Sequence, residues 1–250
     1  MNPIDAPRPL IVAHRGASAE APEHTLAAFE AAVAQEADLI ELDVRLSADG
    51  QLVVIHDEQL ERTTDGRGLV REYTLQALKR LDAGGWFGRA FRGQRIQTLT
   101  ELLERFRDRV RFAIELKEGS DISQGIEERL VSLLQIYDMT AQVWVFSFDH
   151  RALRKVHQMD PEIRTGALLV GRLLNLGALF NEAINALCLQ AELTTERDVE
   201  ACLRAGLECF VWVVNDAEAA RRYAKAGVTG LITDRPGLIR RALLGPPETV

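Results

Sequence analysis

Two acidic residues alternate with aliphatic residues in the segment IELDV of this 250-residue chain. If the segment forms a β-strand, Glu41 and Asp43 project to one side, because successive side chains of a strand point to opposite faces. The later segment IELK places Glu115 and Lys117 in the same relation. Buried carboxylates cost free energy unless they are paired or bind a metal, and carboxylate oxygens suit Mg²⁺ and Ca²⁺. Glu41, Asp43 and Glu115 are therefore candidate metal ligands.

Salt bridges are the structural alternative for these acids. Glu115 has Lys117 and Arg111 as neighbours in the sequence, and Asp43 has Arg45. Pairing of this kind would satisfy a single carboxylate without a metal. Three acids at neighbouring strand ends, with two histidines close by, favour a metal site over salt bridging alone.

The loop that follows Asp43 decides where His56 lies. The dipeptide Asp49-Gly50 is a strong signal for a two-residue hairpin loop. Counting back along both strands from such a loop pairs Asp43 with His56, and directly opposed residues face the same side. We therefore expect His56 to project beside Asp43 and Glu41. A slip of one residue in the register would turn it away.

His14 and Arg15 follow another apolar run, PLIVA, and begin the tripeptide HRG. Two histidines at one site can act as an acid–base pair, in which one removes a proton and the other protonates a leaving oxygen. We assign these roles to His14 and His56. A guanidinium can grip a phosphate and an ammonium can neutralise it, so Arg15 and Lys117 are candidate phosphate-binding residues. Ligation of the metal by His14 is an alternative that a hard cation disfavours.

Trp212, in the late segment FVWVVND, is a weaker candidate. Its place toward the end of an apolar run would put it at the mouth of a substrate pocket. Packing in the protein interior explains a tryptophan there equally well.

Short runs rich in Val, Ile and Leu recur along the chain, and segments with helical periodicity separate them. The runs span residues 9–14, 39–44, 111–116, 142–148, 165–170, 186–190, 208–214 and 230–233. Eight strands alternating with helices in one domain, residues 1–250, predict an α/β fold of the (β/α)8, or TIM, barrel type with its site at the carboxyl ends of the strands. Residues 58–98 break this alternation, and we interpret them as an insertion after the second strand that caps the barrel mouth.

Composition argues against some classes of protein. The net charge of −7 disfavours a general nucleic-acid-binding or acidic-membrane-binding protein, because both need a basic face. Cys188, Cys202 and Cys209 are odd in number and lack a metal-binding spacing, as is typical of free thiols in a reducing compartment. No window has the roughly 18 apolar residues of a membrane span, and no signal-peptide pattern opens the chain. We therefore expect a soluble cytoplasmic protein with a small-molecule substrate, no nucleic-acid partner and no stable membrane association.

At these residues the sequence resembles the glycerophosphodiester phosphodiesterase family of bacterial cytoplasmic type. The matching segments, in the family's order, are AHRGASAEAPEHTLAAFEAA, DLIELDVRLSADGQLVVIHDEQLERTTDGRG, LDAGGWFG, FAIELK, FSFD, VWVVND and GLITDRPG. The resemblance implies a TIM-type barrel that hydrolyses glycerophosphodiesters to glycerol 3-phosphate and an alcohol with a divalent metal. By position it implies metal ligands at Glu41, Asp43 and Glu115, an acid–base pair at His14 and His56, and phosphate contacts at Arg15 and Lys117.

Three positions depart from the family's usual pattern. His24 stands where asparagine is usual, Gln97 where proline is usual, and Val213 where threonine is common. None of the three removes a candidate ligand. His24 lies close to the active-site end of the first predicted strand, and we expect it to alter the hydrogen bonding there.

Several points stay open at the level of the sequence. Three carboxylates accept Mg²⁺, Ca²⁺ or Mn²⁺, and the nucleophile is either water or the 2-hydroxyl of glycerol, which would give a cyclic phosphate. Trp86, Phe87 and Phe91 would supply an apolar mouth in a lysophospholipase D-type lipid phosphodiesterase. A metal-dependent barrel lyase or isomerase has less need of paired histidines, and the complete set of polar residues disfavours a non-catalytic anion-binding barrel. The headgroup alcohol and the oligomeric state leave no mark in the sequence.

Overall fold

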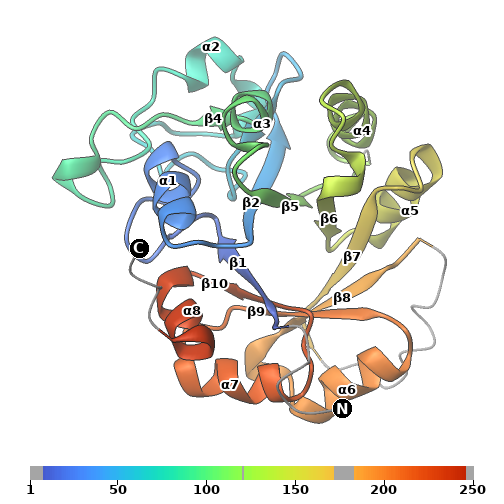
Figure 1. The fold of residues 1–250 in the computed structure, drawn as a ribbon. Helices are drawn as coiled ribbons and strands as arrows, with labels where there is room; N and C mark the ends of the chain where they lie inside the picture. Colours follow the sequence, from blue (N-terminus) through green and yellow to red (C-terminus); the bar gives the residue numbers. More distant parts are fainter. Residues whose placement is uncertain (1–7, 120, 172–182, 246–250) are drawn as a thin grey trace.

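The computed structural model of the chain describes residues 8–119, 121–171 and 183–245. Eight parallel strands form its centre: β1 (Leu10–His14), β2 (Leu39–Leu46), β5 (Arg111–Leu116), β6 (Val143–Ser147), β7 (Arg164–Leu169), β8 (Ala186–Gln190), β9 (Glu208–Trp212) and β10 (Gly230–Thr233). Each pairs with the next in this order, and β1 pairs with both β2 and β10, so the sheet closes into a barrel (Figure 1). The predicted (β/α)8 barrel is confirmed, and each of the eight apolar runs coincides with a strand.

Helices surround the barrel on its outer side (Figure 1). They are α1 (Leu26–Ala34), α3 (Leu99–Phe106), α4 (Ile126–Ile136), α5 (His150–Met159), α6 (Glu196–Arg204), α7 (Ala217–Lys225) and α8 (Pro236–Leu244). Helix α3 shows how the sequence specifies them: Thr98 and Glu101 form a capping box at its start, and Leu102 and Phe106 are buried on its inner face. The main hydrophobic core lies between these helices and the strands.

Aromatic residues fill the inside of the barrel. The rings of Trp144 and Phe146 both pack edge-on against Phe210, with centroids 5.1 and 5.3 Å away. Glycine is required opposite these rings, because a Cβ atom at Gly166 would lie 2.7 Å from Phe146 and one at Gly230 would lie 2.5 Å from Phe210. The inside of the barrel around these rings is therefore a packed core, as is usual for this fold.

The hairpin after β2 differs from the prediction. Strand β3 (Leu52–Val54) runs antiparallel to β2 with Val44 opposite Val54. The N–H of Ile55 donates to the carbonyl of Asp43, 3.1 Å, so Asp43 faces Ile55 and not His56. The predicted register is wrong by one residue.

The length of the loop explains the shift. The N–H of Gln51 donates to Oγ of Ser47, and Ser47 accepts a further bond from Gly50 at its carbonyl, which closes a loop of three residues instead of two. Gly50 has a φ of 74°, the left-handed conformation that ends three-residue hairpin loops. Asp49 is held by Ser47 and by the N–H of Leu75, so its side chain supports the longer loop.

The insertion at residues 58–98 packs beside the barrel, outside β2 (Figure 1). It contains η1 (Val70–Glu72), α2 (Leu75–Leu78) and η2 (Arg89–Phe91), and β4 (Gln97–Thr98) pairs with β3. With β3 it shares a small hydrophobic core of its own, made by Val53, Ile55, Leu60, Val70, Leu78, Ala83 and Ile96. This small core stabilises the fold of the insertion and packs it against β3.

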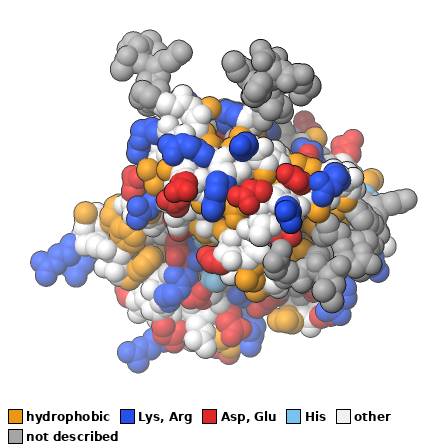
Figure 2. Space-filling model, turned by 90° about the horizontal axis from the view of Figure 1, so that it is seen from below, with side chains coloured by type: hydrophobic (Ala, Val, Ile, Leu, Met, Phe, Trp, Pro, Cys, Tyr) orange, Lys and Arg blue, Asp and Glu red, His pale blue; other side chains and the backbone are white. Residues whose placement is uncertain are grey.

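The surface and the cysteines agree with the composition. The face drawn in Figure 2 shows acidic and basic side chains interspersed, without one continuous basic patch. In the described part of the chain, no helix combines the length and the apolar character needed to cross a membrane. Cys188, Cys202 and Cys209 are buried and free.

Candidate active site

A cavity of about 250 Å³ lies at the carboxyl ends of the barrel strands. Its lining residues are His14, Arg15, Glu41, His56, Glu115, Lys117, Phe146, Phe148, Leu168, Trp212 and Ile232. Seven of the eight candidate residues from the sequence line it. The eighth, Asp43, is not among the lining residues and is 1% exposed.

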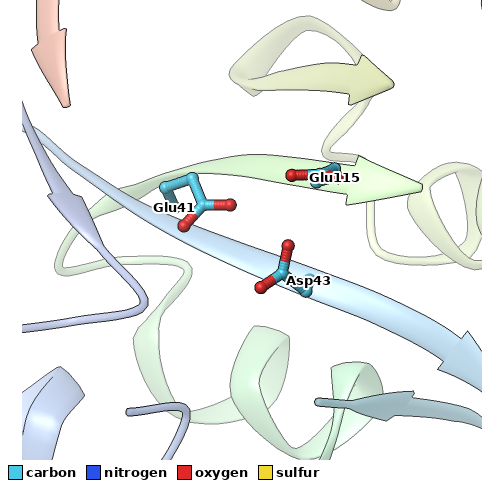
Figure 3. Close-up of side chains that lie close together, drawn as sticks. All are labelled: Glu41, Asp43 and Glu115. Atoms are coloured by element: carbon cyan, nitrogen blue, oxygen red, sulfur yellow. The ribbon is translucent and has the colours of Figure 1, made fainter. Parts of the chain in front are cut away.

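Strand register brings the three acids together. His14 pairs with Glu41 across β1 and β2, and Asp43 pairs with Glu115 across β2 and β5. One oxygen from each of Glu41, Asp43 and Glu115 lies within 4.8 Å of the others. Figure 3 shows the three carboxylates converging from the two neighbouring strands.

The electrostatics of the cluster fit a cation. Burial, together with repulsion from Asp43 and Glu115, raises the pKa of Glu41 well above its usual value. Burial and the charge of Asp43 likewise raise the pKa of Glu115 to about 8. Burial alone would raise the pKa of Asp43 too, but Lys117 and His24 outweigh it and hold that pKa well below the usual range. Ionising all three acids together therefore requires a further positive charge.

One atom of the cluster also lacks a hydrogen-bond donor. Oδ1 of Asp43 is buried, and no donor in the described residues has hydrogen-bonding geometry toward it. The nearest cation, Nζ of Lys117, lies 2.9 Å away as an ion pair. Three clustered carboxylates, one of which has a buried oxygen that accepts no hydrogen bond, are the donor set that a hard divalent cation takes, so the residues fit such an ion. The set of candidate ligands found in the described chain does not include His14.

The salt bridges considered from the sequence are formed in part. Nζ of Lys117 lies 2.7 Å from Oε1 of Glu115, as that alternative expects. Arg45 does not pair with Asp43: it forms an ion pair with Glu118 and donates from Nε to the carbonyl of His56, 2.8 Å. Lys117 thus supplies the positive charge that two of the acids share.

His14 is oriented by a carboxylate at the end of the last strand. Its Nδ1 lies 2.6 Å from Oδ1 of Asp234, which leaves the opposite ring nitrogen for the cavity. Asp234 also accepts from Oγ of Ser18, 2.9 Å, and from Nδ2 of Asn215, 2.6 Å. Burial would raise the pKa of Asp234, but the bonds from His14, Asn215 and Ser18 lower it to about 2. The ionised carboxylate can accept a hydrogen bond from Nδ1 of His14.

His56 has an equivalent partner in the next residue. Its Nδ1 lies 2.5 Å from Oδ1 of Asp57, and Arg62 donates to both oxygens of that carboxylate. Burial lowers the pKa of His56 to about 4, and repulsion from Lys117 and Arg15 adds to this against the attraction of Asp43. His56 is therefore neutral at neutral pH and can accept a proton. His56 faces the same cavity as Glu41, as predicted, although the predicted hairpin register is wrong. Strand β3 ends at Val54, so the strand register does not set the direction of the His56 side chain.

Arg15 is anchored by acids on two sides. Its N–H donates to Oε2 of Glu41, 3.0 Å, and its Nη1 donates to Glu23, 2.9 Å. Glu23 also accepts two bonds from Arg62, each 2.8 Å. Because Arg62 in turn binds the carboxylate beside His56, a continuous network joins Arg15 to His56.

The other half of the cavity is apolar. Phe148 stacks edge-on against Trp212 with centroids 5.8 Å apart, and Trp212 donates from Nε1 to the carbonyl of Cys188, 3.0 Å. Trp212 therefore lines the cavity and also packs against the barrel interior. The apolar residues that a lysolipid enzyme would need, from Trp86 to Phe91, contact one another in the insertion and do not line this cavity.

Sequence reasoning missed the residues that hold the histidines. Asp57 follows His56 directly, and Asp234 is the first residue after the last strand, whereas His14 is the final residue of the first. Both positions were visible as polar residues at strand ends. Glu23 and Arg62 had no such signal in the sequence. Their ion pair joins the loop after β1 to the insertion, two segments that only the folded structure brings together.

Comparison with known proteins agrees with this geometry. The glycerophosphoryl diester phosphodiesterase family model matches residues 14–238. A glycerophosphodiester phosphodiesterase from Caldanaerobacter subterraneus subsp. tengcongensis is 43% identical over 230 residues, which are 91% of this chain and 94% of the relative. A glycerophosphodiester phosphodiesterase structure from Agrobacterium tumefaciens has a TM-score of 0.80 at 36% identity, over 92% of this chain and 98% of that one. An Oleispira antarctica phosphodiesterase, solved in complex with the product sn-glycerol-3-phosphate, has a TM-score of 0.88 at 30% identity, over 94% and 96% of the two chains. The chain belongs to the glycerophosphoryl diester phosphodiesterase family.

Proposed function

We propose that this phosphodiesterase hydrolyses glycerophosphodiesters to glycerol 3-phosphate and an alcohol, by metal-dependent catalysis with two histidines. The observation that carries the proposal is one cavity in which two carboxylate-bound histidines face three clustered acids beside an arginine and a lysine. The product in the Oleispira antarctica structure supports glycerol 3-phosphate as the product here.

Glu41, Asp43 and Glu115 would hold the divalent cation, which the oxygen donors suit as Mg²⁺ or Ca²⁺ and also as Mn²⁺. When bound, such an ion supplies Lewis acidity that stabilises negative charge on a phosphoryl group. Arg15 and Lys117 add positive charge from the protein on the same side of the cavity. The apolar side, with Phe148 and Trp212, receives carbon atoms of the substrate.

Each histidine has one role in moving protons. Neutral His56 takes the proton of the attacking hydroxyl, whether that belongs to water or to the glycerol 2-position. His14, held beside the ionised Asp234, donates a proton to the departing alcohol oxygen as the phosphorus–oxygen bond breaks. In the cyclic-phosphate route, His14 then takes a proton from the water that opens the ring, and His56 returns its proton to the glycerol 2-oxygen. In the direct route, exchange with solvent removes the proton from His56 and returns one to His14.

Asp234 should matter for catalysis although it does not touch the substrate. In Asp234→Asn only one of the two terminal atoms can accept a hydrogen bond, so the amide cannot serve both Asn215 and His14. His14 therefore loses its orientation and the negative charge beside it. We expect kcat to fall by about 10²-fold or more, with a much smaller change in KM. Steady-state kinetics on glycerophosphocholine check this, and a kcat within twofold of wild type would contradict the role of Asp234.

The substrate class is tested with two diesters that share a headgroup. Glycerophosphocholine should release glycerol 3-phosphate at a high rate, whereas lysophosphatidylcholine should react slowly, because the apolar residues of the insertion lie outside the cavity. A preference for the lysolipid would favour a lysophospholipase D-type activity. Failure to release any phosphomonoester from either compound would overturn the proposed reaction.

We place the enzyme in the cytoplasm as part of the same proposal. The three buried cysteines are all free, which is the usual state in a reducing compartment.

A further inference from the structure

A third histidine touches the acidic cluster without lining the cavity. His24 is 5% exposed, and its Nε2 lies 2.7 Å from Oδ2 of Asp43. Its N–H donates to the carbonyl of Arg15, 3.1 Å, which ties the residue to the end of β1. The φ angle of His24 is 61°, in the left-handed region where asparagine, aspartate and histidine are enriched. Both the backbone and the ring of His24 are thus fixed beside Asp43.

The surroundings of the ring define which nitrogen carries the proton. Nδ1 of His24 is buried and has no hydrogen-bond partner among the residues that the structure describes. Nε2 faces a carboxylate oxygen, which can only accept. The neutral tautomer that matches both sides carries its proton on Nε2, so His24 donates to Asp43.

The two oxygens of Asp43 differ in what surrounds them. Oδ2 accepts from His24 and lies 3.4 Å from Nε of Arg15. Oδ1 is on the side of Glu115, because Nζ of Lys117 lies 2.9 Å from Oδ1 and 2.7 Å from Oε1 of Glu115. Figure 3 shows one oxygen of Asp43 directed toward the other two carboxylates and the other directed away.

We propose that His24 is a positioning residue for the metal site, which holds Oδ2 of Asp43 so that Oδ1 stays available to a divalent cation. This rests on the metal site of the proposed function and deepens it. Without the donor, Oδ2 would be buried and unsatisfied, and the carboxylate would rotate to share the remaining cations. Loss of an outer-shell partner of this kind weakens metal binding by about 10- to 100-fold.

Two variants of equal length separate the hydrogen bond from the packing. In His24→Gln the terminal amide nitrogen reaches as far as Nε2 of histidine and keeps a donor. In His24→Met the side chain has the same length and no donor. Both side chains are unbranched at Cβ and equally unsuited to the left-handed backbone of residue 24, so their difference reports the bond to Asp43.

The measurement is calorimetric titration of the full, chelator-treated chain with Mn²⁺ alone. We expect H24M to raise the Kd by about 10- to 100-fold and H24Q to stay close to wild type. Equal weakening in both variants would leave only a packing role, and unchanged affinity in H24M would exclude any role; either result overturns the proposal. If wild type itself fails to bind Mn²⁺, the metal site and the role of His24 fall together. If instead the variants differ in affinity but glycerophosphodiesters are not cleaved, only the proposed reaction fails.

A second test uses the wild-type chain, so it does not depend on whether the variants fold. Nitrogen NMR of ring-labelled histidine should show His24 as the tautomer with its proton on Nε2 and in slow exchange with water. A proton on Nδ1 of His24 with none on Nε2 would contradict the proposal, because Oδ2 of Asp43 would then have no donor from this ring.

Discussion

Exchange of His14 or of His56 for asparagine should lower kcat on glycerophosphocholine by about 10²- to 10⁴-fold. The asparagine amide takes the place of Nδ1, so it can still donate to Asp234 or to Asp57. What each variant loses is the ring nitrogen that faces the cavity. The expected loss therefore reports proton transfer and not collapse of the site, and KM should change far less than kcat.

A substrate with a good leaving group tells the two histidines apart. A p-nitrophenyl diester of glycerol phosphate needs no proton on its departing oxygen, so H14N should recover most of its activity on it. H56N should stay impaired, because the nucleophile still has to lose a proton. Near-normal turnover of glycerophosphocholine by both single variants would exclude the pair altogether, and recovery by H56N instead of H14N would reverse the assignment of acid and base.

Exchange of Glu41 for glutamine should separate metal binding from stability. Glu41 is buried among acids and accepts a bond from the N–H of Arg15, which a glutamine oxygen can still accept. Removal of its charge takes away a ligand, so metal affinity should fall by more than about 10²-fold, beyond the loss of an outer-shell partner. The same change removes a buried acid whose raised pKa opposes folding at neutral pH, so it should raise the Tm of the metal-free protein by about 2 to 4 °C.

The two effects of Glu41→Gln are measured on the same sample. Titration with Mn²⁺ gives the affinity, and a thermal melt in chelator gives the Tm. Glu58→Gln is a matched control, because Glu58 is an exposed acid of the insertion and its ion pair with Arg71 is long, 3.7 Å. Normal metal affinity in E41Q would remove Glu41 from the site, and a lower metal-free Tm would contradict the destabilising effect of the buried Glu41 carboxyl.

The barrel and the acid cluster could be predicted because both depend on local spacing. Alternation by two places Glu41 with Asp43 and Glu115 with Lys117, and this needs no knowledge of the tertiary structure. In a parallel barrel the carboxyl ends of all strands lie at the same end. Because β2 pairs with both β1 and β5, the residues at the ends of these three strands lie close together.

The hairpin shows where local reasoning failed. The Asp-Gly signal marks a turn correctly but does not set its length. Here the side chain of Ser47 binds Gln51, and Asp49 binds a backbone N–H more than twenty residues away, so the loop takes three residues. His56 still reaches the cavity, because it lies beyond the last ladder pair and its direction comes from Asp57 and not from the register.

The hydrogen-bond partners of His14 and His24 could not be predicted from local sequence patterns, for a different reason. The contact of His14 with Asp234 spans 220 residues, and it exists only because β10 closes the barrel against β1. The contact of His24 with Asp43 depends on a left-handed backbone angle that the residue type permits but does not require. Side-chain direction across such distances follows from the folded barrel and not from any pattern in the sequence.

The central claim is that the acids hold a divalent cation on which cleavage of glycerophosphodiesters depends. The direct test is release of glycerol 3-phosphate from glycerophosphocholine by the full chain, before and after treatment with EDTA, and again after addition of Mg²⁺, Ca²⁺ or Mn²⁺. We expect EDTA to abolish release and at least one of the three ions to restore it in wild type but not in E41Q. Undiminished release in EDTA would contradict the account.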